Sequence, residues 1–279
     1  MIQITSDSTC DLGELAPKHG IRLMPLKVIL DTETFKDGVD IAPADIFAFV
    51  EKTGMLPKTS APGIEDFREL FSLLTANGDE VIHFTISSKA SASYSCALAA
   101  SREFDGKVRV VDSLALSSGQ GLLVMKAVDL RDAGKSAAEI EETVNALRAR
   151  VNTSFVPDRL EYLYKGGRCS KMEMYGANIL KIHPMIDMKD GQLGVKKKYR
   201  GKMTVCIKSY IEELKAAYPV YDKTRCFITH SSADAELVEL AREMVQSEFD
   251  FDEVVETVAG SVITGHCGRN TLGVLFIHD

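Results

Sequence analysis

The residues of this sequence best suited to chemistry are serines that lie between a predicted strand and a predicted helix. β-Branched and aromatic residues in segment 81–86 favour a strand, and residues at helical spacing follow from Tyr94 to Ser101. A turn between two such elements presents free backbone N–H groups and the positive end of the helix dipole, which suit a carboxylate or a phosphate. The hydroxyl groups of this turn belong to Ser87, Ser88, Ser91, Ser93 and Ser95.

The same serines also have a purely structural interpretation. A serine before a helix is a common N-cap, because its hydroxyl oxygen accepts a hydrogen bond from an unpaired backbone N–H. One helix start does not need five such residues. We therefore expect at least one hydroxyl group in segment 87–95 to be free for a ligand, although the segment alone does not say which ligand.

Composition limits the classes of function. The chain has 279 residues, of which 45% are hydrophobic and 26% charged, and this balance is typical of a globular protein with one large or two medium domains. The net charge of −7 argues against general nucleic-acid binding. No apolar run approaches the roughly 18 residues of a membrane span. The N-terminal residues lack the features of a signal peptide, so we expect a cytoplasmic protein.

Cysteine and histidine spacing predicts no metal site. The six cysteines form no C-x-x-C pair, and in a chain of this length without a signal we expect them to be reduced. The six histidines show neither H-x-x-x-H nor H-E-x-x-H spacing. A P-loop and the G-x-G-x-x-G motif are also missing, so nothing local supports a nucleotide cofactor.

Alternating strand and helix patterns in residues 1–150 predict a parallel sheet covered by helices. Segment 21–30 is expected to be one strand, segment 31–40 a turn, and segment 57–63 a stiff loop that places the hydroxyl groups of Thr59 and Ser60. Ligands of such sheets bind at the carboxyl ends of the strands. Hydroxyl-rich turns follow three predicted strands, 2–5, 81–86 and 108–111.

A second α/β domain with a mixed sheet is expected over residues 151–279, so the predicted fold class is α/β with two domains. Its first part contains a hairpin, 184–200, that turns at Asp190-Gly191. A helix at 203–217 and a strand at 226–229 follow. His266 is expected in a glycine-containing loop before the last strand, where it could be no more than a turn residue.

A serine hydrolase is one candidate function. Ser91 could be the nucleophile and His266 the base of a stand-alone esterase or acyltransferase. The G-x-S-x-G nucleophile elbow is absent from the sequence, which argues against this class. A binding module for a small anionic or phosphorylated ligand at the helix N-terminus is a further alternative.

Five motifs, taken together and in order, resemble those of the DegV family. They are Ser6-Asp7-Ser8-Thr9-Cys10-Asp11-Leu12, Lys58-Thr59-Ser60-Ala61-Pro62, Ile86-Ser87-Ser88 with Ser91-Ala92-Ser93-Tyr94, Leu163-Tyr164-Lys165-Gly166-Gly167-Arg168, and Gly265-His266-x-Gly268. The resemblance implies two α/β domains with a ligand tunnel between them. It also implies a protein that binds a long-chain fatty acid and serves as the acyl-carrying subunit of a bacterial fatty acid kinase, without a cofactor and without catalysis of its own.

The resemblance implies roles for individual residues. Thr59 and Ser91 match the residues that hold the carboxyl group of the fatty acid, and His266 matches a histidine close to that group. Ser60 and Ser88 lie in the same motifs and are included among the expected ligand-binding residues.

The sequence departs from the family pattern near the expected head group. Ala61 and Gly63 stand where the family usually has an amide and a hydroxyl side chain, and Ser91-Ala92-Ser93-Tyr94 replaces S-G-T-Y. Gly268-Arg269-Asn270 replaces a common Gly-Pro-Gly. Arg269 is therefore expected to add positive charge near the head group.

The expected partner-binding residues are basic. The run Lys196, Lys197, Lys198, Arg200 and Lys202 is the densest positive segment of an acidic chain. Such a run is usually a solvated surface, but it could also dock an acidic partner. Arg168 matches a family arginine linked to the kinase subunit, so we expect Arg168, Lys197 and Lys198 to be exposed and to contact that subunit.

Overall fold

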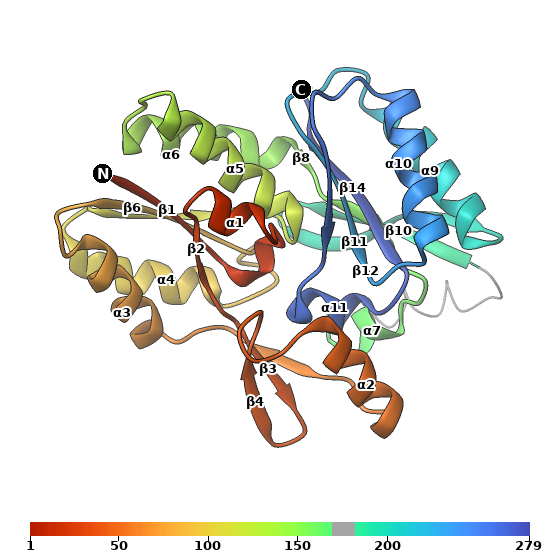
Figure 1. Ribbon diagram of the computed structural model, residues 1–279, viewed down its shortest axis with the longest axis horizontal. Coiled ribbons are helices and arrows are strands. Elements are labelled where there is room, and N and C mark those ends of the chain that lie inside the picture. Colours follow the sequence, from red (N-terminus) through yellow and green to blue (C-terminus); the bar gives the residue numbers. More distant parts are fainter. Residues whose placement is uncertain (169–181) are drawn as a thin grey trace.

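The computed structural model has a mixed α/β fold and describes residues 1–168 and 182–279 (Figure 1). Its strands are β1 Ile2–Asp7, β2 Arg22–Met24, β3 Lys27–Leu30, β4 Glu33–Lys36, β5 Lys58–Ser60, β6 Glu80–Thr85, β7 Val108–Asp112, β8 Val151–Asn152, β9 Ser154–Val156, β10 Ile182–Lys189, β11 Gln192–Arg200, β12 Cys226–Ser231, β13 Val254–Val258 and β14 Thr271–Ile277. Its α-helices are α1 Leu15–Lys18, α2 Pro43–Thr53, α3 Ile64–Thr75, α4 Ser93–Ser101, α5 Ser118–Asp132, α6 Ala137–Leu147, α7 Glu161–Lys165, α9 Met203–Ala217, α10 Ala235–Glu248 and α11 Ser261–Cys267.

The first half is built on a parallel sheet with strand order β2-β1-β6-β7. Alternate side chains of β6 point to opposite faces: Ile82 and Phe84 pack with α5 and α6, whereas Val81 packs with α3 and α4. Both faces of the sheet are therefore buried, and this explains why β6 reads as a nearly continuous apolar run. The prediction of a helix-covered parallel sheet is confirmed.

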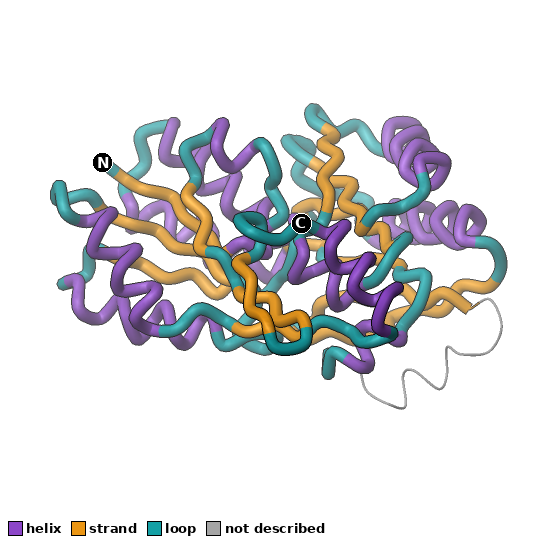
Figure 2. Tube along the Cα trace, turned by 60° about the horizontal axis from the view of Figure 1, so that its bottom comes forward, coloured by secondary structure: helices purple, strands orange, loops and turns teal. Residues whose placement is uncertain are grey.

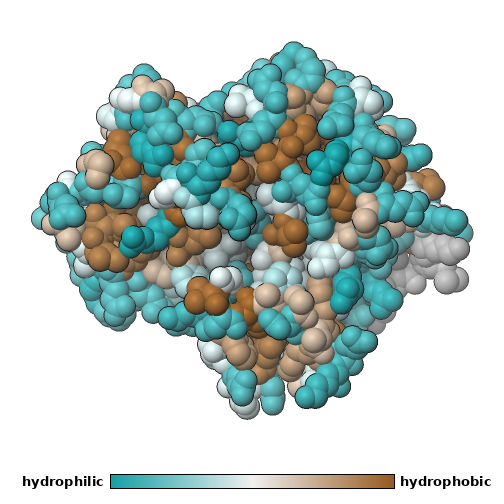
Figure 3. Space-filling view, in the orientation of Figure 1, coloured by the Kyte–Doolittle hydropathy of each residue, from teal (hydrophilic) through white to brown (hydrophobic). Residues whose placement is uncertain are grey.

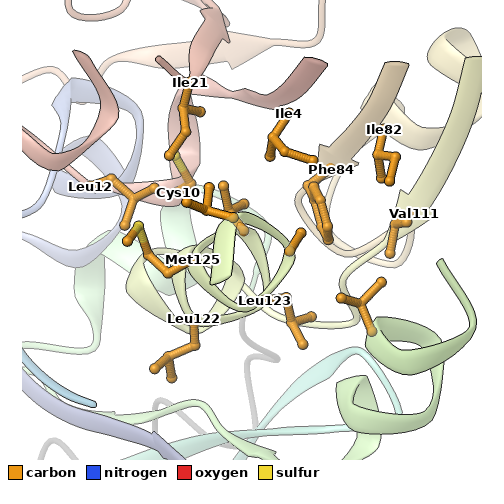
Figure 4. Close-up of a cluster of buried hydrophobic side chains, with 14 of the residues drawn as sticks. Ile4, Cys10, Leu12, Ile21, Ile82, Phe84, Val111, Leu122, Leu123 and Met125 are labelled. Carbon is orange, nitrogen blue, oxygen red and sulfur yellow. The ribbon is translucent and has the colours of Figure 1, made fainter. Parts of the chain in front are cut away.

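The second half is built on a mixed sheet with the order β11-β10-β9-β14-β12-β13, to which β8 adds by pairing with β14. Successive side chains of β14 again point to opposite faces of the sheet. Phe276 packs with α9 and α10, whereas Leu275 and Ile277 join the cluster around α5. Figure 4 shows Met125 of α5 beside Cys10 and Leu12 of the first half, and Leu122 on the opposite side of the same helix. Helix α5 is thus buried between the two sheets.

A small antiparallel sheet, β4-β3-β5, and helix α2 project from the junction of the two halves (Figures 1 and 2). Three predictions were wrong here. Segment 21–30 forms two strands in different sheets, because the chain leaves the first sheet at Pro25, which cannot donate a ladder hydrogen bond. The predicted turn 31–40 contains β4, and the predicted loop 57–63 contains β5, which pairs with β3.

The hairpin prediction is confirmed. β10 and β11 pair around Asp190 and Gly191, whose φ angles of 51° and 79° are those of a tight two-residue hairpin turn. Strands before residue 151 belong to the four-stranded and three-stranded sheets, and strands from Val151 onward belong to the mixed sheet. On this basis we propose the division into domains 1–150 and 151–279.

Hydrophilic residues cover much of the face shown in Figure 3, with apolar residues visible in several separate places. Within residues 1–168 and 182–279, no helix is long and apolar enough to cross a membrane. No group of three or more histidine, cysteine or acidic side chains that could hold a metal ion occurs in the described part of the chain. The five cysteines of these ranges are free, and Cys169 lies outside the described residues.

Candidate ligand-binding site

A pocket of about 250 Å³ lies where elements from both halves and the small sheet meet. Its polar lining side chains are those of Thr59, Ser60, Ser91, Arg168 and His266, of which Thr59 and His266 are in contact with each other. The remaining lining residues have apolar or weakly polar side chains. They are Leu26, Ala61, Ile86, Ala90, Ala92, Leu116, Phe155, Leu163, Leu193, Val262, Ile263 and Cys267. The pocket therefore has the lining expected of a site for a molecule with one polar end.

A second void of about 30 Å³ lies next to the pocket. Four residues line both spaces: Leu116, Phe155, Ile263 and Cys267. The second void reaches Leu275 and Gly273 of β14, in the mixed sheet.

Thr59 and His266 form the polar contact that defines the site. Thr59 Oγ1 lies 2.9 Å from His266 Nε2, although the two residues are 207 positions apart in the sequence. Thr59 is placed by β5, where it pairs with Val28 of β3. The prediction of a loop position for His266 was wrong, because this residue lies in the last turn of α11.

Glycines allow α11 to lie this close to its neighbours. A Cβ atom on Gly265 would lie 2.8 Å from Pro57 Cγ, and one on Gly268 would lie 2.8 Å from the Tyr162 ring. Gly268 also has a φ of 74°, which ends the helix at low conformational cost. In the motif Gly-His-x-Gly, both glycines therefore allow close packing of α11, and Gly268 also allows the chain to leave the helix.

His266 is neutral at pH 7. Burial, together with the positive charge of Arg168, lowers the pKa of His266 to about 4. Because Arg168 is the charged side chain of the lining, the pocket favours an anionic group. A carboxylate fits this electrostatic setting.

Ser91 is the serine of segment 87–95 that lines the pocket. Its hydroxyl oxygen lies 3.2 Å from the backbone nitrogen and 3.2 Å from the hydroxyl oxygen of Ser93, so Ser91 also supports the helix start. Both interpretations of the serines therefore apply to this residue. Ser88 was predicted as a ligand-binding residue, but its side chain is exposed and does not line the pocket, whereas its amide donates to Asp112 at 3.0 Å.

The expectation that Arg168 is exposed was wrong. Arg168 is half-buried, lines the pocket and donates to the carbonyl oxygens of Gly166, at 2.6 Å, and Ala90, at 3.2 Å. The physical reason is a Schellman motif. The amide of Gly167 (φ 74°) bonds Tyr164 O and the amide of Arg168 bonds Leu163 O, so the chain reverses after α7 and directs Arg168 inward.

Arg269 does not reach the predicted head-group position either. Its guanidinium carbon lies 4.2 Å from the centre of the Phe47 ring, on α2, and the residue is exposed. Lys197 and Lys198 are exposed, as expected. Lys197 is paired with Glu213 of α9, and Lys196 lies 3.5 Å from Asp187, so part of the positive run is neutralised within the chain.

Three buried carboxylates hold the site elements in place, and sequence reasoning missed this role. Asp7 accepts the amide of Ile86, Asp11 accepts the amide of Gly260, and Asp37 accepts the amide of Ser261. Their exposed fractions are 0%, 5% and 3%. Asp7, at the end of β1, thus fixes the chain where segment 87–95 begins. Asp11 and Asp37 together fix the start of α11.

The hairpin tip makes a further contact across the two halves. Ser87 Oγ donates to the carbonyl oxygen of Gly191 at 2.6 Å. A Cβ atom on Gly191 would lie 2.6 Å from that hydroxyl oxygen, so a glycine is needed for both the positive φ and the close approach. Leu193, two residues further on, reaches the pocket wall.

The buried carboxyl group of Asp11 predicts a pH dependence of stability. Burial raises the pKa of Asp11 to about 8, with smaller contributions from Asp37 and Asp7. In the unfolded chain the pKa is about 4, so the folded state binds the proton more tightly between these values and its stability falls as the pH rises from about 4 to about 8. Asparagine keeps the acceptor for Gly260 and cannot ionise.

We therefore expect Asp11→Asn to remove the part of the pH dependence of stability that comes from Asp11. Urea unfolding of both proteins at several pH values measures it. The stability of wild type relative to Asp11→Asn should decrease from pH 5 to pH 8 and stay level above that. A constant difference over this range would contradict the assignment of a raised pKa to Asp11.

The fold and the pocket define a two-part α/β protein with a largely apolar pocket that has a few polar lining residues. The family model described as "Uncharacterised protein, DegV family" matches residues 1–279. A fatty acid-binding protein of Thermotoga maritima is 32% identical over 282 residues, which covers 98% of this chain and 96% of that protein. The chain belongs to the DegV family.

Solved structures agree in fold. The structure described as fatty acid binding of a DegV family protein from Thermus thermophilus has a TM-score of 0.92 at 28% identity, covering 100% of this chain and 99% of that chain. A stearic acid-binding protein from Eubacterium ventriosum has a TM-score of 0.87 at 27% identity, covering 100% of this chain and 98% of that chain.

Proposed function

We propose that this protein binds a long-chain fatty acid, with the acyl tail in the apolar part of the pocket and the carboxyl group at Thr59 and Ser91. The observation that carries the proposal is a largely apolar pocket whose few polar lining residues include the contacting pair Thr59 and His266. The names of the relatives from Thermotoga maritima and Eubacterium ventriosum support the same ligand class.

Energetic magnitudes favour a lipid for such a site. Burial of an acyl chain contributes about 0.8 kcal/mol for each CH₂ group, so a dozen of them contribute roughly 10 kcal/mol of transfer free energy. Each hydroxyl hydrogen bond contributes only about 1 kcal/mol. The tail therefore supplies most of the affinity, and the hydroxyl groups fix the position of the carboxyl group.

We further propose that the protein presents this carboxyl group to a separate kinase subunit, which phosphorylates it to an acyl phosphate, and that the carrier acts in the cytoplasm. Small hydroxyl groups hold a carboxylate and leave one oxygen free for the kinase. Because Arg168 lies in the pocket lining, we assign it to the head group and retain Lys197 and Lys198 as the proposed docking residues.

The esterase alternative has less support. His266 Nε2 is engaged by Thr59 rather than by Ser91, and the hydroxyl group of Ser91 contacts Ser93. His266 Nδ1 has no hydrogen-bond partner among the described residues, so an acid that would orient a catalytic histidine is missing from them. A carrier needs none of these arrangements.

Mass spectrometry of the purified protein tests the proposal. We expect a long-chain fatty acid to co-purify in a ratio close to one per chain and to be released on denaturation. An empty protein that takes up no added palmitate and instead hydrolyses ester substrates would support the esterase and overturn the carrier proposal.

If the basic residues of the hairpin dock the kinase subunit, the interaction should depend on salt concentration. Replacing Lys196, Lys197 and Lys198 together with alanine should slow capture by an acidic kinase subunit, most strongly at low salt, because exposed charges mainly change association rates. Lipid content should not change. The measurement is kinase activity titrated against carrier concentration at two ionic strengths.

Three exposed lysines elsewhere provide the matched control: Lys18, Lys52 and Lys107. Their triple alanine variant loses the same net charge. Equal slowing in both triple variants would show an effect of total charge and remove the docking assignment of the hairpin.

A further inference from the structure

The second ring nitrogen of His266, Nδ1, is buried and has no hydrogen-bond partner among the described residues. A methyl carbon placed on Gly166 would lie 2.3 Å from Nδ1, so one Cα–H bond of Gly166 points at this nitrogen. The Tyr162 carbonyl oxygen, 3.0 Å from the same point, accepts the Gly166 amide and makes no hydrogen bond with Nδ1.

This contact distinguishes the two neutral forms of the ring. If Nδ1 carried the proton, a buried N–H would meet a C–H bond and remain unsatisfied, which is unfavourable. If Nδ1 carries its lone pair, the Gly166 C–H bond is a weak donor to it. His266 is neutral at pH 7, because burial and Arg168 lower its pKa to about 4, so only one nitrogen is protonated.

We propose that Gly166 holds His266 in the Nε2–H tautomer and thereby directs the hydroxyl proton of Thr59 toward the ligand. Nε2–H then donates to Thr59 Oγ1, across the observed 2.9 Å, and the hydroxyl hydrogen is free. In the other tautomer Thr59 donates to the ring and presents only lone pairs to the pocket. Gly166 is thus a positioning residue that makes Thr59 a donor for a carboxylate, and this consequence rests on the proposed function.

Nitrogen NMR of the ligand-free protein reads the tautomer directly. Protein labelled with ¹⁵N-histidine gives long-range ¹H–¹⁵N correlations, and the signals that disappear in His266→Gln belong to His266. We expect a bare Nδ1 and a protonated Nε2 at pH 7. A protonated Nδ1 would overturn the proposal, whether or not the protein binds a fatty acid.

Two neighbouring glycines provide a matched pair of variants. Gly166 has a helical φ of −74°, so alanine is acceptable to the backbone there; its Cβ would press on the His266 ring, at 2.3 Å from Nδ1, and lie 3.0 Å from the Tyr162 carbonyl oxygen. Gly167 has a φ of 74° and open space around it, so alanine strains the backbone without touching the ring. Gly166→Ala should shift the His266 nitrogen signals and Gly167→Ala should not. The reverse pattern would contradict the contact.

Ligand preference tests the consequence for Thr59. Palmitate and hexadecan-1-ol share a tail, and their ratio of affinities, measured by displacement of a fluorescent fatty acid, reports the head group. Removing the donor in His266→Leu should lower the preference for palmitate about tenfold, and His266→Gln, which keeps an amide donor, should restore most of it. An unchanged ratio in His266→Leu would overturn the proposed role. If palmitate binds to none of the proteins, the proposed function fails while the tautomer remains measurable.

Discussion

Replacing Thr59 with alanine is expected to reduce phosphorylation of the bound acid by roughly 10- to 100-fold, with most of the lipid retained. In the proposed function the apolar wall supplies the affinity, and the variant leaves it untouched, whereas the hydroxyl group proposed to fix the carboxyl group is lost. Displacement of a reacting group by about 1 Å can cost about 100-fold in rate. Acyl phosphate formation with ATP and the kinase subunit, together with lipid content by mass spectrometry, measures both effects.

Thr59→Ser is the matched control, because it keeps the hydroxyl group and removes one methyl group. It should retain phosphorylation within a few fold of wild type. Ser91→Ala should resemble Thr59→Ala, since Ser91 lines the same pocket and is proposed to hold the same carboxyl group. Parallel losses of lipid binding and phosphate transfer in Thr59→Ala would show that the head group supplies the affinity and would contradict the division of roles.

Replacing Asp7 with asparagine is expected to lower the free energy of unfolding by about 2–4 kcal/mol. Asp7 Oδ1 accepts from the amide and hydroxyl of Thr9 and from Gln120 Nε2, and Oδ2 accepts from the amide of Ile86 at 2.9 Å. In either orientation the NH₂ group of asparagine faces an N–H donor. The expected decrease in Tm is roughly 5–10 °C.

Differential scanning calorimetry of the two proteins measures this effect. Asp252→Asn, at an exposed position, should change stability by no more than about 0.5 kcal/mol. Because Asp7 also holds Ile86, the turn before Ser91 should exchange its amide hydrogens faster in Asp7→Asn. Wild-type stability in this variant would show that the buried carboxylate does not stabilise the turn.

Local patterns were sufficient for helix α9 and for the hairpin. The helix predicted at 203–217 and the turn at Asp190-Gly191 are both present in the structure. Strands with weak local signals were missed. β4, Glu33–Lys36, contains charged residues on an exposed hairpin, and β5, Lys58–Ser60, exists because it pairs with β3. Such pairing depends on residues far apart in the chain.

The sequence alone determined the alternating α/β order, the resemblance to a family through five ordered motifs, and the choice of Thr59, Ser91 and His266 as candidate site residues. Tertiary structure decided what these residues contact. Only the folded chain brings Thr59 to His266 and turns Arg168 into the pocket, and it leaves Ser88 and Arg269 outside it. The reason is that helix and strand periodicity is encoded within a few residues, whereas these contacts depend on packing between segments about 80 to 200 residues apart, which no local pattern specifies.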